Sequence, residues 1–573
     1  MTRFLNSLLL IFLILRASGQ SSDHIDPNYF DAPVKIPIFL AGNFAELRPN
    51  HFHGGIDIKT QGRTGISVYA AAEGYISRIV LSPTGYGRAL YINHPNGTTT
   101  VYGHLQSFVK PIDDYIRTIQ YEKETFAIDQ AVPEGMLPVK KGGLIAKSGN
   151  AGSSAGPHLH FEIRRTKEEV MLNPLLFHLP VNDKTKPSIQ ALMVYPLSDD
   201  ACVSGKQSPQ RFYVIPGAKG YQLKVNQTIP VFGKIGFGVK TVDLLDGSPN
   251  KCAIYSIRLL VDKKLIYSFK MDEVAIVQSK YVNSHMDYSY AVRSGQRLYR
   301  TWLEPGNKLN VYDAVVERGI LTETDEQIHH VTYEISDVYG NSTSLSFAIQ
   351  SREMPVKQVV HPGEKFRYDR NNEIDDDGID FSVPEGALYS DVDFIYEKKT
   401  NLSRYYAPVF RLHDPSVALH VACPLRIKAD GLPERFQGKA MLAQIDPVSG
   451  RILSATGNFE HGWVVGNVRV LGNYTVVVDT VAPKIISISI AEKKLLKDVN
   501  GLRFKVTDNL SGIEKYRGTI DGKWVLFEYD LKNNLISYSF DKIRMEFGKS
   551  HELVFEVVDY KGNSSTYKAK FYK

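Results

Sequence analysis

The chain has 573 residues and is 43% hydrophobic, 23% charged and 11% aromatic, which excludes a disordered, a collagen-like or a disulfide-framework protein. At about 150 residues per domain, this length predicts three to four domains. The net charge of +6 is too small and too dispersed for a nucleic-acid partner, so none is expected.

The N-terminal residues have the pattern of an export signal. Arg3 is a short basic segment, residues 8–15 are apolar, and residues 17–19 (Ala-Ser-Gly) form a small-residue cleavage site. The apolar segment is about half as long as the roughly 20 residues of a spanning helix, and no longer apolar run follows it. We therefore predict a signal peptide at residues 1–19, no transmembrane segment, and export to the periplasm or to the cell surface.

Histidines and strand signals are concentrated in the first third of the chain. Six of the 16 histidines lie between residues 51 and 160, so side chains able to titrate or to bind metals gather there. Short apolar–polar alternations surround them and predict a domain of antiparallel β-sheet over residues 20–180. The alternations lie at residues 66–70, 74–80, 89–93, 98–102 and 158–163.

One segment of this domain has a helical pattern instead. Apolar residues stand at Ile112 and at the third, fourth and seventh positions after it, which is one face of a short helix. We interpret the helix as part of an insertion at about residues 106–137. Because it follows His104 closely, we expect it to rim a groove beside that residue.

The rest of the chain contains a diverged internal repeat. Residues 239–247 resemble 504–512, and residues 329–342 resemble 551–564. Each copy ends with a strand, an Asp-x-x-Gly-Asn-Ser turn and another strand, which is typical of a hairpin in a β-sandwich. The aspartates that mark each copy are 94 residues apart in the first and 51 in the second, which predicts an insertion at about residues 270–315.

These repeats divide the remainder into three modules. We predict a β-sandwich with the insertion at 181–351, a β-rich module at 352–478 and an immunoglobulin-like β-sandwich at 479–573. The acidic run 375–377 in the middle module is a calcium loop or a solvated turn, and its spacing favours the turn because it matches no standard calcium motif. The protein is thus predicted to be mainly β.

Three cysteines are too few for a disulfide framework, and their odd number leaves at least one unpaired. They are Cys202, Cys252 and Cys423. Cys202 and Cys252 form one candidate disulfide, and three buried thiols are the alternative.

Three segments bring candidate metal ligands into the first domain. They are His53-Gly-Gly-Ile-Asp57, Tyr102-Gly-His104 and His158-Leu-His160. Alternate strand residues share a face, so His158 and His160 project together. If the segments converge, they supply three ligands for a zinc ion and two further histidines for proton transfer. Each segment alone also occurs by chance or in an ordinary turn, but their joint occurrence favours a metal site.

The three segments resemble the lysostaphin/LytM-type zinc endopeptidase family, which cleaves peptide cross-bridges of bacterial peptidoglycan. The resemblance covers about residues 38–178 and includes four flanking segments. These are residues 42–48, 70–74, 139–142 and 148–156. The stretch between Leu105 and Val139 is longer than the usual connection of the family.

The resemblance implies a role for each motif residue. His53, Asp57 and His160 would hold one zinc ion, and His104 and His158 would be the catalytic histidines. The N-terminal antiparallel β-sheet domain would then be a zinc peptidase, followed by β-sandwich, immunoglobulin-like modules. Every ligand position of the family pattern is filled.

The function implied is that of an exported zinc endopeptidase, which hydrolyses stem peptides or cross-links of peptidoglycan with metal-activated water. The alternative is a non-hydrolytic, peptidase-like regulator that activates a cell-wall amidase; such proteins typically lack some ligands. The C-terminal modules are expected to position the peptidase or to bind an envelope protein. Deleting residues 181–573 would then spare hydrolysis of soluble muropeptides and alter the action on intact sacculi.

Other polar residues near the motifs have weaker patterns. His51 is interpreted as a groove or surface residue, and His94 as a structural residue of a hairpin turn. Glu162 either orients His160 or is a paired strand residue, and the structural role is favoured. His329 and His551 occupy equivalent repeat positions, which predicts a shared packing role.

Overall fold

The computed structural model describes residues 25–573 except 219, 226, 400–404, 491–493, 497, 498 and 543. The predicted signal peptide at residues 1–19 lies outside the described residues. The described chain is mainly β, with largely antiparallel sheets and a few short helices, which confirms the predicted fold class. None of its helices is both long and apolar enough to span a membrane.

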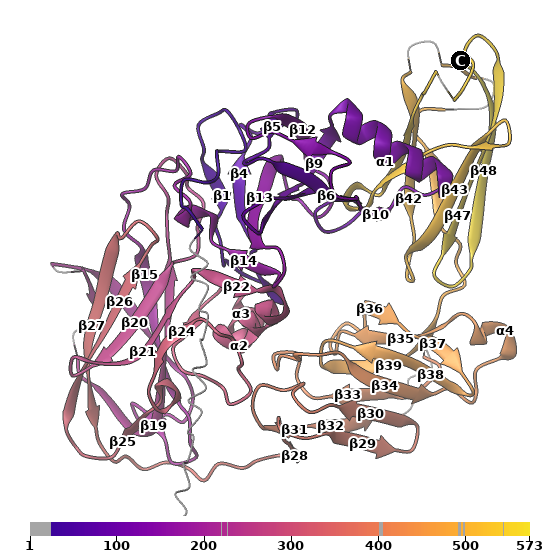
Figure 1. The fold of residues 1–573 in the computed structure, drawn as a ribbon. Helices are drawn as coiled ribbons and strands as arrows, with labels where there is room; N and C mark the ends of the chain where they lie inside the picture. The colour runs from indigo at the N-terminus through magenta and orange to yellow at the C-terminus, as the bar shows by residue number, and fades with distance from the viewer. Residues whose placement is uncertain are drawn as a thin grey trace, which may run out of the picture.

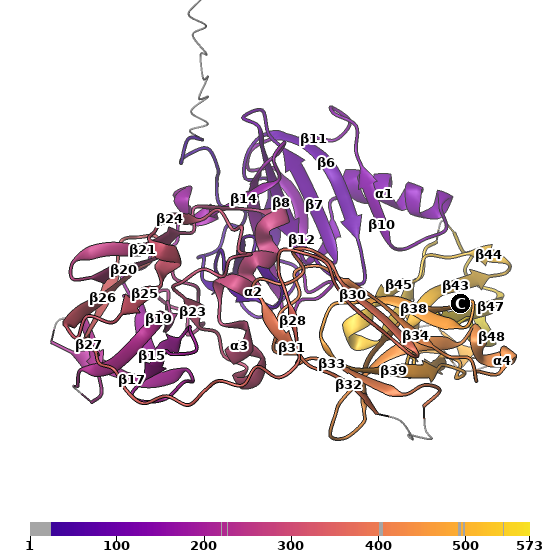
Figure 2. The same cartoon turned by 90° about the horizontal axis from the view of Figure 1, so that it is seen from below.

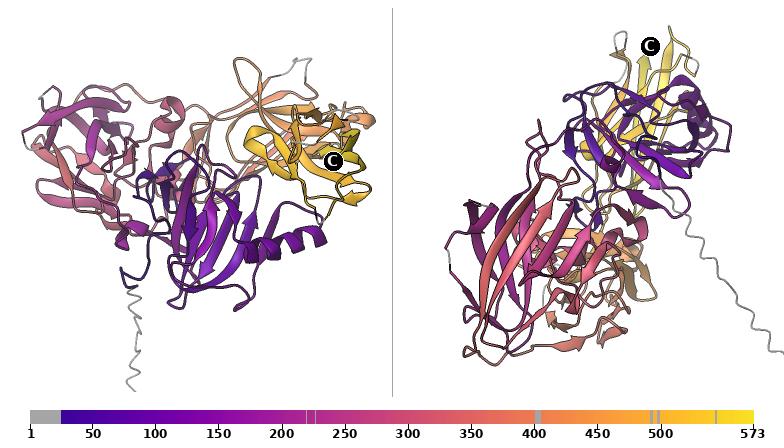
Figure 3. Two further views of the ribbon diagram at one scale, coloured as in Figure 1. Left: turned by 90° about the horizontal axis from the view of Figure 1, so that it is seen from above. Right: turned by 60° about the vertical axis from the view of Figure 1, so that its left-hand side comes forward.

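Figure 1 shows four parts of the chain. We call them the N-terminal domain (25–180), the second module (181–351), the third module (352–478) and the C-terminal module (479–573). The N-terminal domain lies between the second module on the left and the C-terminal module on the right, with the third module below. The view from below in Figure 2 and the two views in Figure 3 also place the N-terminal domain beside both neighbours.

The N-terminal domain is built on one large antiparallel sheet, in the order β1-β4-β13-β8-β7-β6-β10. The bounds are β1 Leu40–Gly42, β4 Ile56–Lys59, β13 His158–Arg165, β8 Thr98–Gly103, β7 Arg88–Asn93, β6 Gly74–Leu81 and β10 Ile128–Ala131. At its margins β11 (Pro138–Val139) pairs with β6, and β14 (Val170–Leu172) pairs with β13. A smaller sheet, β5-β12-β9, is formed by Ser67–Tyr69, Leu144–Ser148 and Leu105–Phe108. A short pair, β2 (Leu47–Arg48) with β3 (His51–Phe52), precedes the first motif.

The helix expected in the insertion is α1, Lys110–Glu122. Its apolar face buries Ile112 and Ile116 in the domain core. Its far end points to the C-terminal module: the ring centroids of Tyr121 and Trp524 are 5.1 Å apart, and Arg517 pairs with Glu124 just beyond the helix. The insertion therefore docks a distant module onto the N-terminal domain (Figure 1).

The second module is one 12-stranded sheet that closes on itself, because β19 also pairs with β27. Its main strands run β16-β19-β15-β17-β18-β27-β26-β20-β21-β24, and β23 and β25 pair with β19. Their bounds are β15 Ser188–Pro196, β16 Cys202–Val203, β17 Gln210–Gly217, β18 Gly220–Leu223, β19 Ile229–Val242, β20 Ser256–Val261, β21 Lys264–Lys270, β23 Tyr299–Arg300, β24 Tyr312–Val315, β25 Leu321–Glu323, β26 Ile328–Ser336 and β27 Ser342–Ser351.

The segment expected as an insertion near 270–315 joins this module to the N-terminal domain. It contains β22 (Glu273–Ala275), a 3-10 helix (Ile276–Tyr281), α2 (Val282–His285) and α3 (Tyr288–Ser294). β22 pairs with β14 and thereby extends the large sheet of the N-terminal domain. The domain's sheet thus includes a strand from outside residues 25–180.

The third module has two five-stranded sheets, β29-β30-β34-β38-β37 and β32-β33-β39-β35-β36, and a short β28-β31 pair. The bounds are β28 Glu364–Phe366, β29 Asn372–Asp376, β30 Ile379–Val383, β31 Val392–Phe394, β32 Tyr396–Lys399, β33 Val409–Leu412, β34 Cys423–Lys428, α4 Glu434–Gln437, β35 Ala440–Ile445, β36 Ile452–Thr456, β37 Asn458–Glu460, β38 Trp463–Val468 and β39 Gly472–Val478. The acidic run 375–377 is exposed at the β29–β30 turn, where Asp376 accepts a hydrogen bond from Tyr396 at 2.7 Å.

The C-terminal module packs the sheet β40-β42-β46-β45 against β41-β48-β47-β43-β44. The bounds are β40 Lys484–Ser487, β41 Lys494–Leu495, β42 Gly501–Thr507, β43 Ile513–Ile520, β44 Lys523–Trp524, β45 Glu528–Asp530, β46 Leu535–Ser539, β47 Ser550–Asp559 and β48 Ser564–Tyr572. The three cysteines, all in the second and third modules, are buried free thiols.

Candidate metal centre

His160 and Asp57 meet because they are direct cross-strand partners. His160 lies on β13, where it is opposite Asp57 of β4 on one side and Gly103 of β8 on the other. Directly opposed residues of antiparallel strands have Cβ atoms about 5 Å apart, within reach of an imidazole and a carboxylate. The Nδ1 of His160 lies 2.8 Å from Oδ1 of Asp57.

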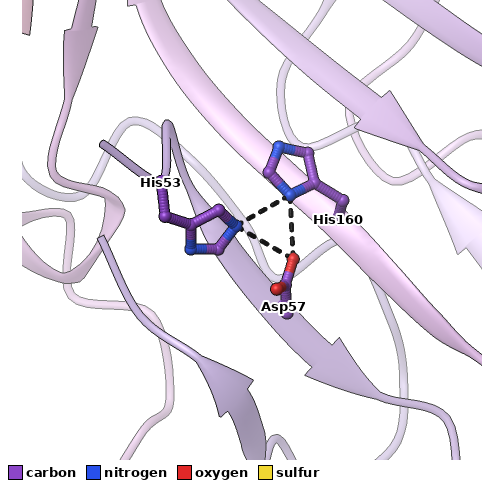
Figure 4. Close-up of side chains that lie close together, drawn as sticks. All are labelled: His53, Asp57 and His160. Carbon is purple, nitrogen blue, oxygen red and sulfur yellow. Dashed lines mark hydrogen bonds and ion pairs between the residues drawn. The ribbon is translucent and has the colours of Figure 1, made fainter. Parts of the chain in front are cut away.

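His53 completes the group from the loop before β4. Its Nε2 lies 3.0 Å from Oδ1 of Asp57 and 3.0 Å from Nδ1 of His160. The triangle of side chains is drawn in Figure 4. The glycines of this loop are required for close approach, because a Cβ at Gly55 would lie 2.1 Å from the carbonyl oxygen of Phe161.

The protonation of the two rings makes this triangle a cation site. His53 Nδ1 faces the carbonyl of Asn43 at 2.7 Å, and His160 Nε2 faces Oε1 of Glu162 at 2.7 Å, so in the neutral rings these nitrogens carry the protons. In that neutral state, two nitrogen lone pairs and a carboxylate oxygen face one another in a buried space; without a metal ion the His160 ring holds a second proton, whose place a bound cation would take. Two imidazoles and one carboxylate are a donor set of catalytic zinc sites, so the residues fit that metal.

Charge at the site agrees with this reading. Burial would raise the pKa of Asp57, but His53, His158 and His160 hold that pKa far below its usual value. The other carboxylate oxygen, Oδ2, accepts a hydrogen bond from Arg48 at 2.6 Å. Asp57 therefore stays ionised, with Oδ1 directed to the histidines.

A second layer of polar side chains fixes His160. Burial would lower the pKa of His160, but its hydrogen bonds to Asp57 and Glu162 raise it to about 9. Glu162 is fully buried, accepts a 2.6 Å hydrogen bond from Arg164 Nε, and also accepts one from the Tyr86 hydroxyl. The sequence favours a purely structural role for Glu162 as a paired strand residue. This role is incomplete, because the Glu162 carboxylate also orients the His160 ring.

Replacing Glu162 with Gln is expected to weaken zinc binding by about 10- to 100-fold, the usual effect of losing an outer carboxylate. The amide no longer carries the charge that makes the His160 ring a stronger ligand. Zinc affinity measured by competition with a chelating dye checks this. The matched control is Glu168→Gln at an exposed residue, and an unchanged affinity in Glu162→Gln would remove this role.

His104 and His158 lie next to each other, with ring centroids 4.7 Å apart. His104 Nδ1 faces the carbonyl of Ala151 at 2.8 Å, and His158 Nδ1 faces that of Gly156 at 2.9 Å. Each Nδ1–H therefore donates to a main-chain oxygen, which leaves Nε2 as the proton acceptor. His158 Nε2 lies 3.4 Å from Asp57 Oδ1.

The position of His104 depends on local backbone geometry. It follows β8 in the left-handed region, with φ of 58°, and its N–H donates to the carbonyl of Tyr86 at 2.8 Å. Left-handed backbone is costly for a residue other than glycine and is often retained at functional sites. Burial and the proximity of His160 and His158 lower the pKa of His104 to about 3, so its ring is neutral.

A pocket of about 670 Å³ opens over these histidines. His53, His104 and His160 line it together with Tyr86 and Arg164. The second module forms part of the wall with Ile276, Ser279 and Lys280. The sequence patterns gave no signal for this wall, because the segment lies more than 100 residues from the motifs.

The expectation that the insertion helix rims the groove is wrong for this pocket: no residue of α1 is among the described residues that line it. The C-terminal module does approach the groove from another side. Lys532 donates to the carbonyl of Ser154 at 2.9 Å and to that of Asn150. Both carbonyls belong to the glycine-rich segment before His158.

The remaining histidines lie outside the triangle. His51 is exposed at the rim of the pocket, and buried His94 is held between the Glu73 carbonyl and the Thr100 hydroxyl. His329 and His551 make the same contact in their modules, each with its Nδ1 at 2.7 Å from an aspartate, Asp262 and Asp521 respectively.

Comparisons with known proteins match two parts of the chain. The model of Peptidase family M23 matches residues 51–120, and that of the Zu5-like domain matches residues 363–479. An uncharacterized metalloprotease of Haemophilus influenzae is 31% identical over 134 residues, which are 23% of this chain and 22% of that protein. The DD-carboxypeptidase/endopeptidase Mpg of Neisseria meningitidis serogroup B is 32% identical over 152 residues, 26% of this chain and 29% of that protein.

The matched part spans less than a third of the length of these two relatives. Among solved structures, the catalytic domain of the antimicrobial peptidase lysostaphin from Staphylococcus simulans aligns with 24% of this chain and 87% of its own, at 21% identity and a TM-score of 0.18. The resemblance stated from the motifs is confirmed over a part of the chain, and this part is of the lysostaphin/LytM type, peptidase family M23.

Proposed function

We propose that this protein is an exported zinc endopeptidase that hydrolyses peptide bonds in the stem peptides or cross-links of bacterial peptidoglycan. The observation that carries the proposal is the buried triangle of His53 Nε2, Asp57 Oδ1 and His160 Nδ1, whose atoms lie 2.8 to 3.0 Å apart. The relatives named metalloprotease and DD-carboxypeptidase/endopeptidase support the reaction class.

His53, Asp57 and His160 are the residues that would hold one zinc ion. When bound, zinc lowers the pKa of water and polarises a substrate carbonyl. Arg48 keeps the second oxygen of Asp57 occupied, and Glu162 keeps the His160 ring in the orientation that directs Nδ1 inward. The ligands are thus fixed before the substrate binds, which is required for efficient catalysis.

His158 and His104 supply the proton transfer in this proposal. A neutral Nε2 accepts the proton of the attacking water, while Nδ1–H stays on a main-chain carbonyl and holds the ring. The protonated ring then donates to the departing amine. Before this transfer, the positive charge of the protonated ring stabilises the negative charge that develops on the scissile carbonyl oxygen.

The second module contributes Lys280 to the lining of the pocket, and the main-chain carbonyl of this residue is held by the Tyr389 hydroxyl at 3.0 Å.

The amidase-regulator alternative is disfavoured because the ligands and both additional histidines are all present and converge. Envelope location and export follow from the proposed substrate and from the signal pattern of residues 1–19. Binding of an envelope protein by the C-terminal modules stays a prediction.

Mass spectrometry of cross-linked muropeptides incubated with residues 20–573 tests the proposal. We expect products shortened by hydrolysis of one peptide bond, loss of these products after chelation, and recovery on adding one equivalent of zinc. A zinc-loaded protein that cleaves nothing but stimulates an amidase would establish the regulator instead.

A further inference from the structure

Two groups of three aspartates lie at equivalent positions of the two repeated modules. The first triad is Asp183, Asp243 and Asp337; the second triad is Asp479, Asp508 and Asp559. In each triad, one oxygen from every carboxylate lies within 4.8 Å of the other two. Both triads are far from the histidine motifs in sequence and form no part of the proposed peptidase site.

The two triads are built in the same way. Asp337 accepts hydrogen bonds from the main-chain N–H of Asn341 at 2.9 Å and from its side chain at 2.6 Å. Asp559 and Asn563 repeat these contacts at 2.8 and 2.7 Å. The same two amides also donate to the main-chain oxygens of the first aspartates, Asp183 and Asp479. The Asp-x-x-Gly-Asn turn of the repeat thus fastens the start of each module to its end.

The carboxylates of the first triad are left with uncompensated negative charge, whereas Lys561 interacts electrostatically with Asp479 and Asp559 of the second triad without forming an ion pair. Asp243 is 2% exposed and Asp183 is 9% exposed, and Oδ1 of Asp243 and Oδ2 of Asp183 are buried with no hydrogen-bond partner. Asp508 has the same unpartnered Oδ1 in the second triad. Across the part of the chain that the structure describes, none of the six carboxylates forms an ion pair with Lys, Arg or His. Buried charges of one sign without partners are strongly unfavourable.

We propose that each triad binds one calcium ion. The donors are all carboxylate oxygens, which suit a hard cation, and oxygens up to 4.8 Å apart can share a Ca²⁺ ion with ligand distances of 2.3–2.6 Å. Zinc favours nitrogen and sulfur donors, which neither triad supplies. The acidic run 375–377 lacks these features, because its side chains are exposed and Asp376 is bonded to Tyr396.

The location assigns a role to the ions. Asp183 follows the N-terminal domain and Asp479 follows β39 of the third module, so each triad stands where the chain passes from one part into the next. A calcium ion there ties the connecting segment to two loops of the following module. The ions therefore stabilise the junctions that hold the N-terminal domain and the C-terminal module in place.

Calcium counting on the purified full-length protein tests the proposal, with zinc measured in the same sample. After equilibrium dialysis against millimolar CaCl₂, the range in which extracellular modules bind, we expect two calcium ions per chain. Asp243→Asn and Asp508→Asn should each remove one ion and weaken that site by on the order of 100-fold, since affinity depends on ligand charge. The matched control, Asp375→Asn with Asp376→Asn, should retain both.

The melting temperature separates a lost ligand from a misfolded variant. In EDTA, Asp243→Asn should be as stable as the wild type or more so, because it removes buried repulsion. In calcium, the wild type should be the more stable. Failure of the wild type to bind calcium, or triad variants that bind two ions, would overturn the proposal. Zinc content and peptidase activity are measured separately from calcium binding. Failure of the calcium proposal is therefore distinguishable from failure of the proposed peptidase function.

Discussion

Replacing His158 with alanine is expected to lower kcat/KM for peptidoglycan peptides by about 10²- to 10⁴-fold while one zinc ion per chain is retained. The ring donates through Nδ1–H to the Gly156 carbonyl at 2.9 Å, so its loss removes a positioned proton acceptor at Nε2. Since His158 is not part of the triangle with His53 and His160, the metal ligands remain.

Asp57→Ala is the contrasting variant. It removes the only carboxylate of the triangle and leaves Arg48 without the partner that it contacts at 2.6 Å. We expect loss of both zinc and activity. Zinc content and cleavage rate are measured on the same preparations of both variants. Wild-type turnover in His158→Ala would exclude it as the proton acceptor, and full zinc content in Asp57→Ala would exclude the proposed ligand set.

A fragment ending at residue 180 is expected to be unfolded or molten, although the sequence places a domain boundary there. Deleting residues 181–573 should therefore abolish hydrolysis of soluble muropeptides as well, contrary to the expectation from the sequence. Four large apolar side chains of the N-terminal domain pack in the core of the second module: Phe44, Leu47, Phe52 and Met171. Each is at most 8% exposed, and burying such a side chain contributes about 1.5–3 kcal/mol. Their combined loss approaches the whole stability of a typical domain, about 5–15 kcal/mol.

Main-chain contacts are lost in the same fragment. Deletion unpairs β14 from β22 and leaves both Asn43 amide contacts with Ala253, each 2.8 Å, unmade. A longer fragment, residues 25–351, keeps this interface and serves as the control; it should unfold cooperatively and bind zinc. Thermal unfolding of the two fragments, followed by circular dichroism, tests this prediction. A 25–180 fragment that unfolds as cooperatively and is as stable as the 25–351 fragment would contradict this account.

The sequence was informative where the geometry is local or repeated. Strand alternation predicted that His158 and His160 share a face, helical spacing after Ile112 predicted α1, and the repeat predicted that His329 and His551 have equivalent surroundings. These inferences need only the period of a strand or helix, or the likeness of two segments. The same alternation extends to Glu162 and Arg164 on β13, and it was a usable signal for their role beside His160.

Long-range packing explains what the sequence did not predict. The pairing of β22 with β14 and the contact of Lys532 with the Ser154 carbonyl depend on how whole modules pack. The periodicity of a sequence does not encode such packing. The docking of α1 on the C-terminal module instead of the groove has the same origin. Likewise, the repeat marked Asp243 and Asp337, and the fold shows that Asp183 joins them.

The measurement that tests the zinc site most directly is anomalous diffraction at the zinc edge from crystals of the full-length protein. The account predicts a zinc peak bounded by His53 Nε2, Asp57 Oδ1 and His160 Nδ1. Absence of density there in zinc-loaded crystals, or zinc only at another candidate group such as Glu323, Asp325 and His329, would contradict the assignment of this site as the metal centre.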